Sequence, residues 1–353
     1  MNPPKDLTPG LSPESGANGE PPAGGRLEAA DGRSARGVWR AVLVRLGPLL
    51  GLACVVALFG FLRPATFLTA GNFQIMLLQT AVVATAALGM TLVIISGGID
   101  LSIGSNIALC TVVVALLLGK GAPPWVAVLG GVATGAACGA LNGTLVTRLR
   151  LTPFIVTLGT WGALRGLAKG LAHETMVNAP TTWINGLLQS LRPAQRWMLF
   201  PPGVWLMLVL TGLVAALLRY TRFGRHVFAL GSNEQTARLC GVPVERTKLY
   251  IYTLGLAFAG VAGVLQFSYL TVGDPTTAAG MELAVIAAVV IGGASLHGGE
   301  GSVLGALVGA LIMTVVANGC TKLNLANWVQ EIVTGAIIVS AVALERVRNR
   351  GEG

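Results

Sequence analysis

Long apolar runs, separated by short polar or glycine-rich breaks, cover most of the chain between residues 38 and 344. A helix needs roughly 20 apolar residues to cross the hydrocarbon core of a bilayer, and most of these runs approach that length. The pattern predicts an all-α integral membrane protein with ten membrane segments, some of them broken or short. The predicted segments cover residues 38–62, 73–96, 101–118, 124–146, 153–171, 203–218, 249–270, 283–291, 303–317 and 328–344.

Two parts of this pattern are not ordinary spans. Residues 283–291 are too few to cross a bilayer at a rise of about 1.5 Å per residue. We therefore predict a half-helix or one part of a broken helix there. Residues 172–202 form a polar stretch that contains Trp183 and Trp197. Such rings are enriched at the membrane–water interface, so this stretch is predicted to lie at the membrane surface.

The composition agrees with a surface that faces lipid. The chain is 53% apolar and 11% charged, with a mean hydropathy of +0.72. Soluble domains carry about 25% charged residues. The net charge of +9 is explained by basic residues that flank membrane segments on the cytoplasmic side. No basic patch interleaved with aromatic residues is present, which argues against a nucleic-acid partner.

A membrane domain, residues 37–345, is predicted between two polar tails. Residues 1–36 are rich in proline, glycine, serine and charge, which predicts a disordered tail. Because this tail precedes the first apolar run, we expect no secretory signal peptide. Most of the 24 Lys and Arg residues lie in that tail, in the loop after the fourth segment, in residues 222–248 and in the C-terminal tail 346–353. The positive-inside rule therefore predicts that these parts, and both termini, are cytoplasmic.

A weak internal repeat divides the membrane domain. Residues 93–105 read VIISGGIDLSIGS and residues 290–302 read VIGGASLHGGEGS, each an apolar run followed by glycines and a polar turn. They fall in two halves, residues 73–171 and 249–345, which an odd number of spans separates. We therefore expect inverted repeats with glycine-broken helices, an arrangement that marks the pathway in transporters. The alternative is that glycine-rich packing motifs recur by chance. Glycines at every fourth position, as at 135, 139 and 143, predict closely packed helices.

The charge-rich residues 222–248 contain signals for one short helix. Ser232 is a possible N-cap, and Gln235 could complete a capping box with it. Gly241 lies where a C′ glycine would end the helix. About eight residues, 233–240, would be helical, too few to be stable alone in water. The helix must therefore pack on this chain or on a partner.

Polar residues at the helix breaks are candidates for a pathway. Asp100 follows a break, where a lone carboxylate is costly unless water, a cavity or a helix N-terminus stabilises it. It is either a cap of the third segment, beside Ser102, or part of a gate. The neutral donors and acceptors inside the spans suit either a pathway for a hydroxylated solute or hydrogen bonds between helices. The candidate path or gate residues are Gly97, Gly98, Asp100, Ser102, Asn106, Asn142, Thr157, Gly292 and Gly293.

Several activities are excluded by missing motifs. No G-x-x-x-x-G-K-[ST] motif occurs, so the chain should not hydrolyse ATP itself. The sequence also shows no set of nucleophile and base and no cluster of metal ligands, so we expect neither an enzyme nor a cofactor or metal. Its five cysteines form no C-x-x-C pair. Glu282 and Glu331 begin the eighth and tenth segments, and no clear carboxylate lies at mid-membrane, which argues against ion coupling.

Four motifs resemble the ribose-type permease family of bacterial ABC importers. They are GMTLVIISGGIDLSIGS (89–105), NGTLVTRLRLTPFIVTLGT (142–160), GRHVFALGSNEQTARLCGV (224–242) and MELAVIAAVVIGGASLHGGEGSVLGALVGAL (281–311). The resemblance implies a vitamin B12-importer-like permease bundle in the bacterial inner membrane. It also implies a second permease chain, identical or different, an ABC ATPase subunit and a periplasmic sugar-binding protein. The implied function is ATP-driven import of a monosaccharide such as ribose, xylose or galactose.

The same resemblance identifies residues 233–241 as the coupling helix that docks on the ATPase. Glu234 and Arg238 are spaced to pair on one face, and Ala237 and Leu239 would supply packing. The implied coupling residues are Ser232, Asn233, Glu234, Ala237, Arg238, Leu239 and Gly241. A helix that lies on the membrane surface is the alternative.

The chain departs from the family pattern at three positions. An acidic residue expected after Leu283 is absent, Glu300 replaces an arginine, and Thr334 replaces a lysine often found in the last span. These departures affect the substrate and the ATPase contacts. The alternative functions are a stand-alone secondary sugar transporter or facilitator and a membrane scaffold or sensor.

Overall fold

The computed structural model describes residues 47–190 and 198–350, apart from the side chains of 344–350. The predicted N-terminal tail and Trp197 lie outside the described residues. The compact unit considered below begins at Pro48.

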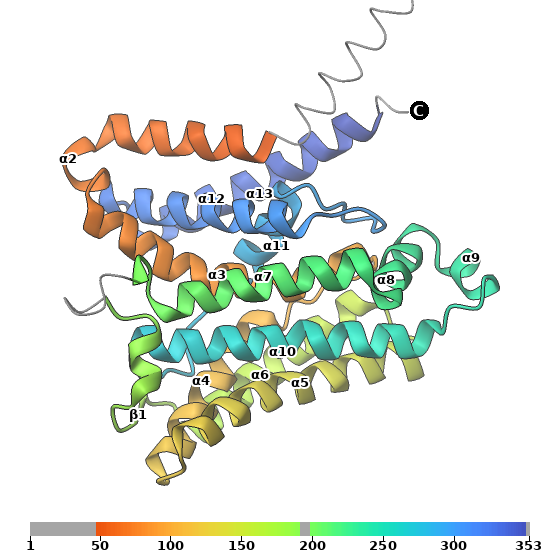
Figure 1. Cartoon of the computed structure of the whole chain (residues 1–353), viewed down its shortest axis with the longest axis horizontal. Helices are drawn as coiled ribbons and strands as arrows, with labels where there is room; N and C mark the ends of the chain where they lie inside the picture. Colours follow the sequence, from red (N-terminus) through yellow and green to blue (C-terminus); the bar gives the residue numbers. More distant parts are fainter. Residues whose placement is uncertain (1–46, 191–197, 351–353) are drawn as a thin grey trace, which may run out of the picture. The chain divides into compact units, whose positions relative to one another are not determined.

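Most of the described chain is helical, with one pair of very short strands (Figure 1). After a helix over Gly47–Leu62, the elements are α2 (Pro64–Phe67), α3 (Ala70–Ile95), α4 (Ile103–Gly119), α5 (Pro124–Arg148), α6 (Pro153–Leu171), β1 (Val177–Asn178), η1 (Trp183–Leu187), α7 (Pro202–Tyr220), α8 (Arg222–Ser232), α9 (Glu234–Leu239), α10 (Val244–Leu270), β2 (Val272–Gly273), α11 (Met281–Ile291), α12 (Val303–Lys322) and α13 (Asn327–Arg350).

Each predicted membrane segment coincides with a helix, and the fold class is confirmed as an all-α membrane protein. Within the described ranges, five helices are long and apolar enough to cross a membrane, namely α3, α5, α7, α10 and α12. The first segment is described from Gly47 onward. The 11 residues of α11 span about 16 Å at the rise of an α-helix. This length confirms that the eighth segment is too short to cross. Helix α13 continues to Arg350, so part of the predicted C-terminal tail is helical.

Helix α3 lies at the centre of the bundle. In its most apolar stretch of 18 residues, 89% are buried, and it packs against α10, α12, α11 and α7. Small residues allow this packing. Gly89, for example, lies against the backbone carbonyl of Gly255 in α10, where a Cβ atom would collide. Lipid offers no hydrophobic drive for helix association, so such close approach supplies the packing energy.

The predicted stripes of glycine also form close helix contacts. Gly135 and Gly139 of α5 lie against backbone carbonyls of α10, and a Cβ at either position would overlap with them. Gly309 of α12 lies in the same way against the carbonyl of Ala288 in α11. These contacts confirm the prediction of closely packed helices.

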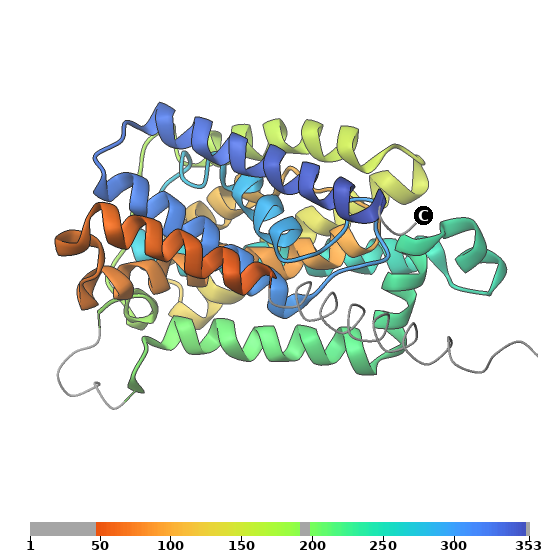
Figure 2. The ribbon, with the colours of Figure 1, turned by 90° about the horizontal axis from the view of Figure 1, so that it is seen from above.

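Helix α10 runs the length of the bundle and defines its two ends (Figures 1 and 2). At its start it follows α9, and we call this the α9 end. At its other end it leads into β2, which pairs antiparallel with β1, and we call this the β1 end. Helix η1 is fixed there by Ser268, whose Oγ accepts from the Leu188 amide at 3.0 Å and donates to the Asn185 carbonyl at 3.2 Å. The elements β1 and η1, which belong to the predicted surface stretch, thus lie at one end of the bundle.

The two glycine-rich turns lie together at the α9 end. The amide of Gly299 donates a hydrogen bond of 2.8 Å to the Ile95 carbonyl, and a Cβ on Gly298 would lie 2.8 Å from Cα of Gly97. Equivalent turns of inverted halves would lie at opposite ends. Matching these two motifs as equivalent positions of a repeat is therefore wrong, because their similarity reflects packing against each other. The inverted relation of residues 73–171 and 249–345 stays a prediction.

Candidate coupling site and translocation residues

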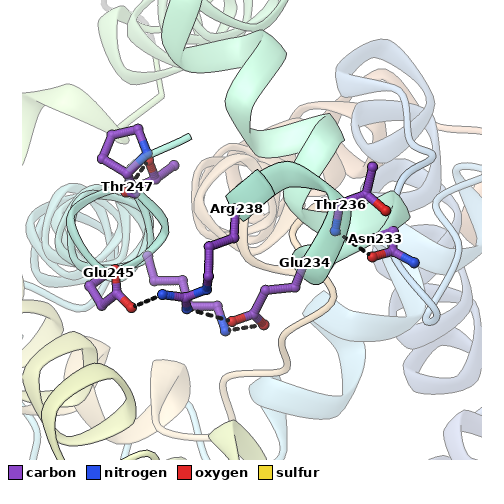
Figure 3. Close-up of polar contacts among 8 residues, drawn as sticks. Asn233, Glu234, Thr236, Arg238, Glu245 and Thr247 are labelled. Carbon is purple, nitrogen blue, oxygen red and sulfur yellow. Dashed lines mark hydrogen bonds and ion pairs between the residues drawn. The ribbon is translucent and has the colours of Figure 1, made fainter. Parts of the chain in front are cut away.

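Helix α9 is capped at both ends, but its start differs from the prediction (Figure 3). Ser232 ends α8, and Asn233 is the N-cap: its Oδ1 accepts from the Thr236 amide at 2.8 Å. The predicted capping box of Ser232 with Gln235 is wrong, because the chain turns to an extended conformation only at Asn233, with φ −161° and ψ 108°. The helix has six residues rather than about eight.

The end of α9 follows the prediction. Gly241 has φ +83°, the left-handed conformation that favours glycine after a helix. Its amide donates to the Arg238 carbonyl at 3.1 Å, and the Val242 amide donates to the Ala237 carbonyl at 3.0 Å. These bonds satisfy carbonyls that the short helix leaves free.

Ion pairs brace α9 against the first turns of α10 (Figure 3). Arg238 lies between Glu234, at 3.6 Å, and Glu245, at 2.6 Å, and Lys248 Nζ lies 2.6 Å from Glu234 Oε2. We call these four residues the ionic brace. The hydrogen bond to Glu245 raises the pKa of Arg238, so its guanidinium stays charged. Because the brace is exposed, salt screens it and each pair stabilises the structure only weakly.

The two apolar side chains of α9 face different ways. Ala237 is buried in the main core of this chain, whereas Leu239 is 89% exposed. The short helix therefore packs partly on this chain, through Ala237, and leaves Leu239 exposed to solvent or a partner.

A charged cavity of about 520 Å³ lies beside the ionic brace. It is formed between the connection of α5 to α6, which contributes Arg150 and Thr152, and the brace residues of α9 and α10. Both signs of charge line it, so it is suited to polar or charged groups of another protein rather than to an apolar ligand.

Helix α8 joins α9 to the glycine turns. Near its end, Gly231 lies directly against the carbonyl of Ile95 and the amide of Gly299. A Cβ on Gly298 would lie 2.9 Å from Cα of Gly231 and 2.8 Å from Cα of Gly97. We call Gly97, Gly231, Gly298 and Gly299 the glycine junction. These contacts join backbone to backbone, so side-chain rotation cannot relax them.

Three of the predicted path residues form one buried network at the start of α4, and a fourth bonds to the backbone beside it. Asp100 Oδ1 accepts from the amide and the hydroxyl of Ser102, at 2.8 and 2.6 Å. Asn142 of α5 donates to Ser102 Oγ at 3.0 Å and to Asp100 Oδ2 at 3.3 Å. Thr157 of α6 donates to the Ile99 carbonyl at 3.2 Å. Asp100 thus closes a turn two residues before Ser102, which is the N-cap of α4 and makes no side-chain cap hydrogen bond. The roles of Asp100 as a cap or as part of a gate both stay predictions.

The remaining predicted path residues are dispersed. Asn106 donates to the Leu256 carbonyl of α10 at 3.4 Å, and Gly292 packs against the backbone of Gly305. Gly98 lies beside the Tyr252 hydroxyl, and Gly293 has φ +92°. Among the described residues, none of the predicted path residues lines the cavity beside the ionic brace.

A second cavity, of about 740 Å³, involves residues that the sequence reasoning missed. It lies toward the β1 end, between α3, α10, α11, α12 and α13, and none of the predicted path residues lines it either. Its polar lining is Gln79, Gln266, Tyr269, Thr314, Asn327, Gln330, Glu331 and Thr334. The signal in the sequence was a glutamine inside an otherwise apolar run, at Gln79 and again at Gln266. We call this space the amide-lined cavity.

A bundle of long apolar helices, with a short capped helix at one end, defines a polytopic membrane protein. The chain belongs to the family described as "Branched-chain amino acid transport system / permease component", which matches residues 72–342.

Its relatives include the ribose import permease protein RbsC of Escherichia coli strain K12, 38% identical over 306 residues, which are 87% of this chain and 95% of that protein. RbsC of Bacillus subtilis strain 168 is 37% identical over 87% of this chain and 94% of the Bacillus protein. The fructose import permease protein FrcC of Rhizobium meliloti is 35% identical over 85% of this chain and 84% of FrcC. No solved structure matches the chain. These matches confirm the resemblance to ribose-type permeases and the prediction of a transport subunit rather than an enzyme.

Proposed function

We propose that this chain is the membrane-spanning subunit of an ATP-driven importer that moves a monosaccharide into the cytoplasm. The observation that carries the proposal is α9, a capped and braced helix that exposes Leu239 at one end of the bundle. The chain has no P-loop of its own, so ATP must be hydrolysed by a partner that docks there. The relatives named as ribose and fructose import permeases support a sugar as cargo.

The glycine junction supports a mechanism for coupling. Movement of α9 by the ATPase would shift α8, and Gly231 would transmit that shift to the turn after α3 and to the loop before α12. The first turn carries the Asp100 network, and the second leads back to the half-helix α11. The turn after α3 and the loop before α12 would thus both respond to the movement of α8.

The proposed assembly contains a second permease chain, an ABC ATPase subunit and a periplasmic sugar-binding protein. The excess of Lys and Arg in residues 222–248 and at both termini supports a cytoplasmic α9 end in the bacterial inner membrane. The β1 end then faces the periplasm, where the binding protein would deliver its sugar. Exposed apolar side chains on α6 and α13, such as Ile155 and Ile332, are available for lipid or for the second chain.

Reconstitution in proteoliposomes tests the proposal. The chain is co-expressed with its ATPase and binding protein, and uptake of D-ribose, D-xylose, D-galactose, D-allose, D-fructose and L-arabinose is measured. L-leucine serves as the control, since the family description mentions amino acids. We expect uptake of one or more of the sugars that requires ATP and is blocked by vanadate. Uptake by the chain without an ATPase would instead establish the stand-alone transporter.

A further inference from the structure

We propose that the amide-lined cavity is a transit site that holds the monosaccharide on its way through the subunit, with Gln79, Gln266 and Tyr269 as its hydrogen-bonding residues. The inference rests on the proposed function and adds the place where the sugar is held.

The glutamines carry the argument. Gln79 lies in α3 and Gln266 in α10, both within apolar membrane helices and both half-buried. A polar side chain that faces hydrocarbon is costly unless its hydrogen bonds are satisfied. A cavity that admits water or a polar solute removes that cost. In such a cavity the two amides can replace water as hydrogen-bonding partners of sugar hydroxyls, which explains two glutamines in this position.

The amides retain hydrogen-bonding capacity. Gln79 Nε2 donates to the Tyr269 hydroxyl at 3.4 Å, and Gln266 Nε2 donates to Thr277 Oγ1 at 2.9 Å. Within the described part of the chain, neither amide oxygen accepts a hydrogen bond. Two amide oxygens and a phenol at one wall can accept from, and donate to, adjacent hydroxyls of a sugar.

The size and charge of the cavity fit a neutral polyol. Its volume of about 740 Å³ falls within the range of small-molecule sites, roughly 300–1,000 Å³. Glu331 is the only charged side chain among its described lining residues. A neutral sugar needs no countercharge, whereas a phosphorylated sugar would be repelled by this carboxylate.

The half-helix α11 closes one side of the cavity and links it to the coupling machinery. Ala278, Ala279 and Gly280, just before α11, belong to the lining, and Gly280 has φ +77°. Arg165 of α6 also holds this segment, by donating to the Pro275 and Thr277 carbonyls at 3.0 and 2.6 Å. At its other end, α11 leads to the loop that carries Gly298 and Gly299. A shift at the glycine junction would therefore move the wall of the cavity.

Paired substitutions in the reconstituted importer test the site. Gln79→Leu removes the amide, and Gln74→Leu is the matched control in the same helix, since Gln74 does not line the cavity. With saturating binding protein, we expect at least a tenfold fall in sugar moved per ATP for Gln79→Leu and wild-type values for Gln74→Leu. Co-purification of the ATPase with both variants shows that folding and assembly are retained.

Labelling provides a second measurement that does not depend on transport. Thr334→Cys lines the cavity, whereas Ile332→Cys, on the same helix, is exposed and does not line it. In a background without the native cysteines, a membrane-impermeant methanethiosulfonate should modify the first from the periplasmic side, and the transported sugar should slow that modification at least fivefold. The second should react slowly and without protection.

The outcomes separate the two proposals. If no sugar of the panel crosses the membrane, the proposed function fails, whatever the labelling shows. If a sugar crosses with wild-type sugar per ATP in Gln79→Leu, or does not protect Thr334→Cys, the transit site is wrong and the importer stands.

Discussion

The amide of Gly299 donates a 2.8 Å hydrogen bond to the carbonyl of Ile95, and so ties the loop before α12 to the end of α3. The two residues are far apart in the sequence. Gly231 of α8 lies against both groups of this bond, with no room for a side chain. The helix that leads to α9 is thus in backbone contact with both breaks in the membrane helices.

Gly231→Ala should disrupt this contact. Its Cβ would overlap with the Ile95 carbonyl, and forced overpacking costs about 1–3 kcal/mol. We expect a lower midpoint of thermal unfolding in detergent and at least a tenfold loss of ATP-dependent uptake. Gly212→Ala in α7 is the control, because nothing lies within 4 Å of a Cβ there. Equal behaviour of the two variants would contradict the role of the junction.

Exchange of the charges on α9 should release it from α10. The double variant Glu234→Arg, Arg238→Glu keeps a pair within the helix but sets like charges against Lys248 and Glu245. We expect about a tenfold loss of uptake with an unchanged midpoint of thermal unfolding, since the brace is exposed. Unchanged uptake would count against the coupling assignment.

Adding Glu245→Arg and Lys248→Glu to that double variant restores opposite charges throughout the brace. Recovery of uptake would show that the brace acts within this chain. If uptake stays low, Glu234 and Arg238 act by direct contact with the ATPase, and measuring both variants in parallel distinguishes the two roles.

Leu239→Asp should weaken docking of the ATPase without affecting the fold. The side chain is 89% exposed, so its replacement costs this chain little, but a carboxylate buried at an interface would be unpaired. We expect the ATPase to be lost during co-purification. The control is Leu129→Ala, at an exposed leucine toward the β1 end. Alanine is used there because an aspartate at this position would face lipid. Retention of the ATPase by Leu239→Asp would place the docking surface elsewhere.

Asp100→Asn distinguishes a cap from a gate. Asparagine keeps an acceptor for the Ser102 amide, so a purely structural Asp100 predicts near wild-type uptake. A charge-dependent gate predicts a loss of uptake with normal stability. Asp100→Ala leaves the amide and the hydroxyl of Ser102 buried without their acceptor, which costs about 1–3 kcal/mol. Its midpoint of unfolding should therefore fall in either case.

The helices could be predicted from the sequence because length and apolarity suffice to recognise a membrane segment. The close packing at Gly139 was also predicted from a local pattern of small residues, although the pattern did not identify α10 as the partner helix. Helix α8 was not predicted because its apolar residues, Phe223, Val227 and Leu230, are spaced among charges in a stretch that we interpreted as charge-rich with one short helix, at residues 233–240. The N-cap was assigned to Ser232 rather than Asn233 because both residues cap well, and only the end of α8 decides between them.

The sites depend on contacts that no local pattern contains. Gln79 and Gln266 share a cavity, although α3 and α10 are far apart in the chain. The two glycine motifs were matched by composition, whereas the structure places them against each other. The candidate path residues Asp100, Ser102, Asn142 and Thr157 do gather, because polar groups buried between helices must find partners.

Helix α11 covers only about half the thickness of a bilayer, and the residues 274–280 before it form turns with no helix or strand. A helix this short begins after Gly280 and ends just before Gly292, so it can tilt without bending a continuous membrane helix. The energy of such a movement is then set mainly by the contacts along the flanks of α11, where it packs on α3 and α12, and by the backbone contact of Gly309 with Ala288.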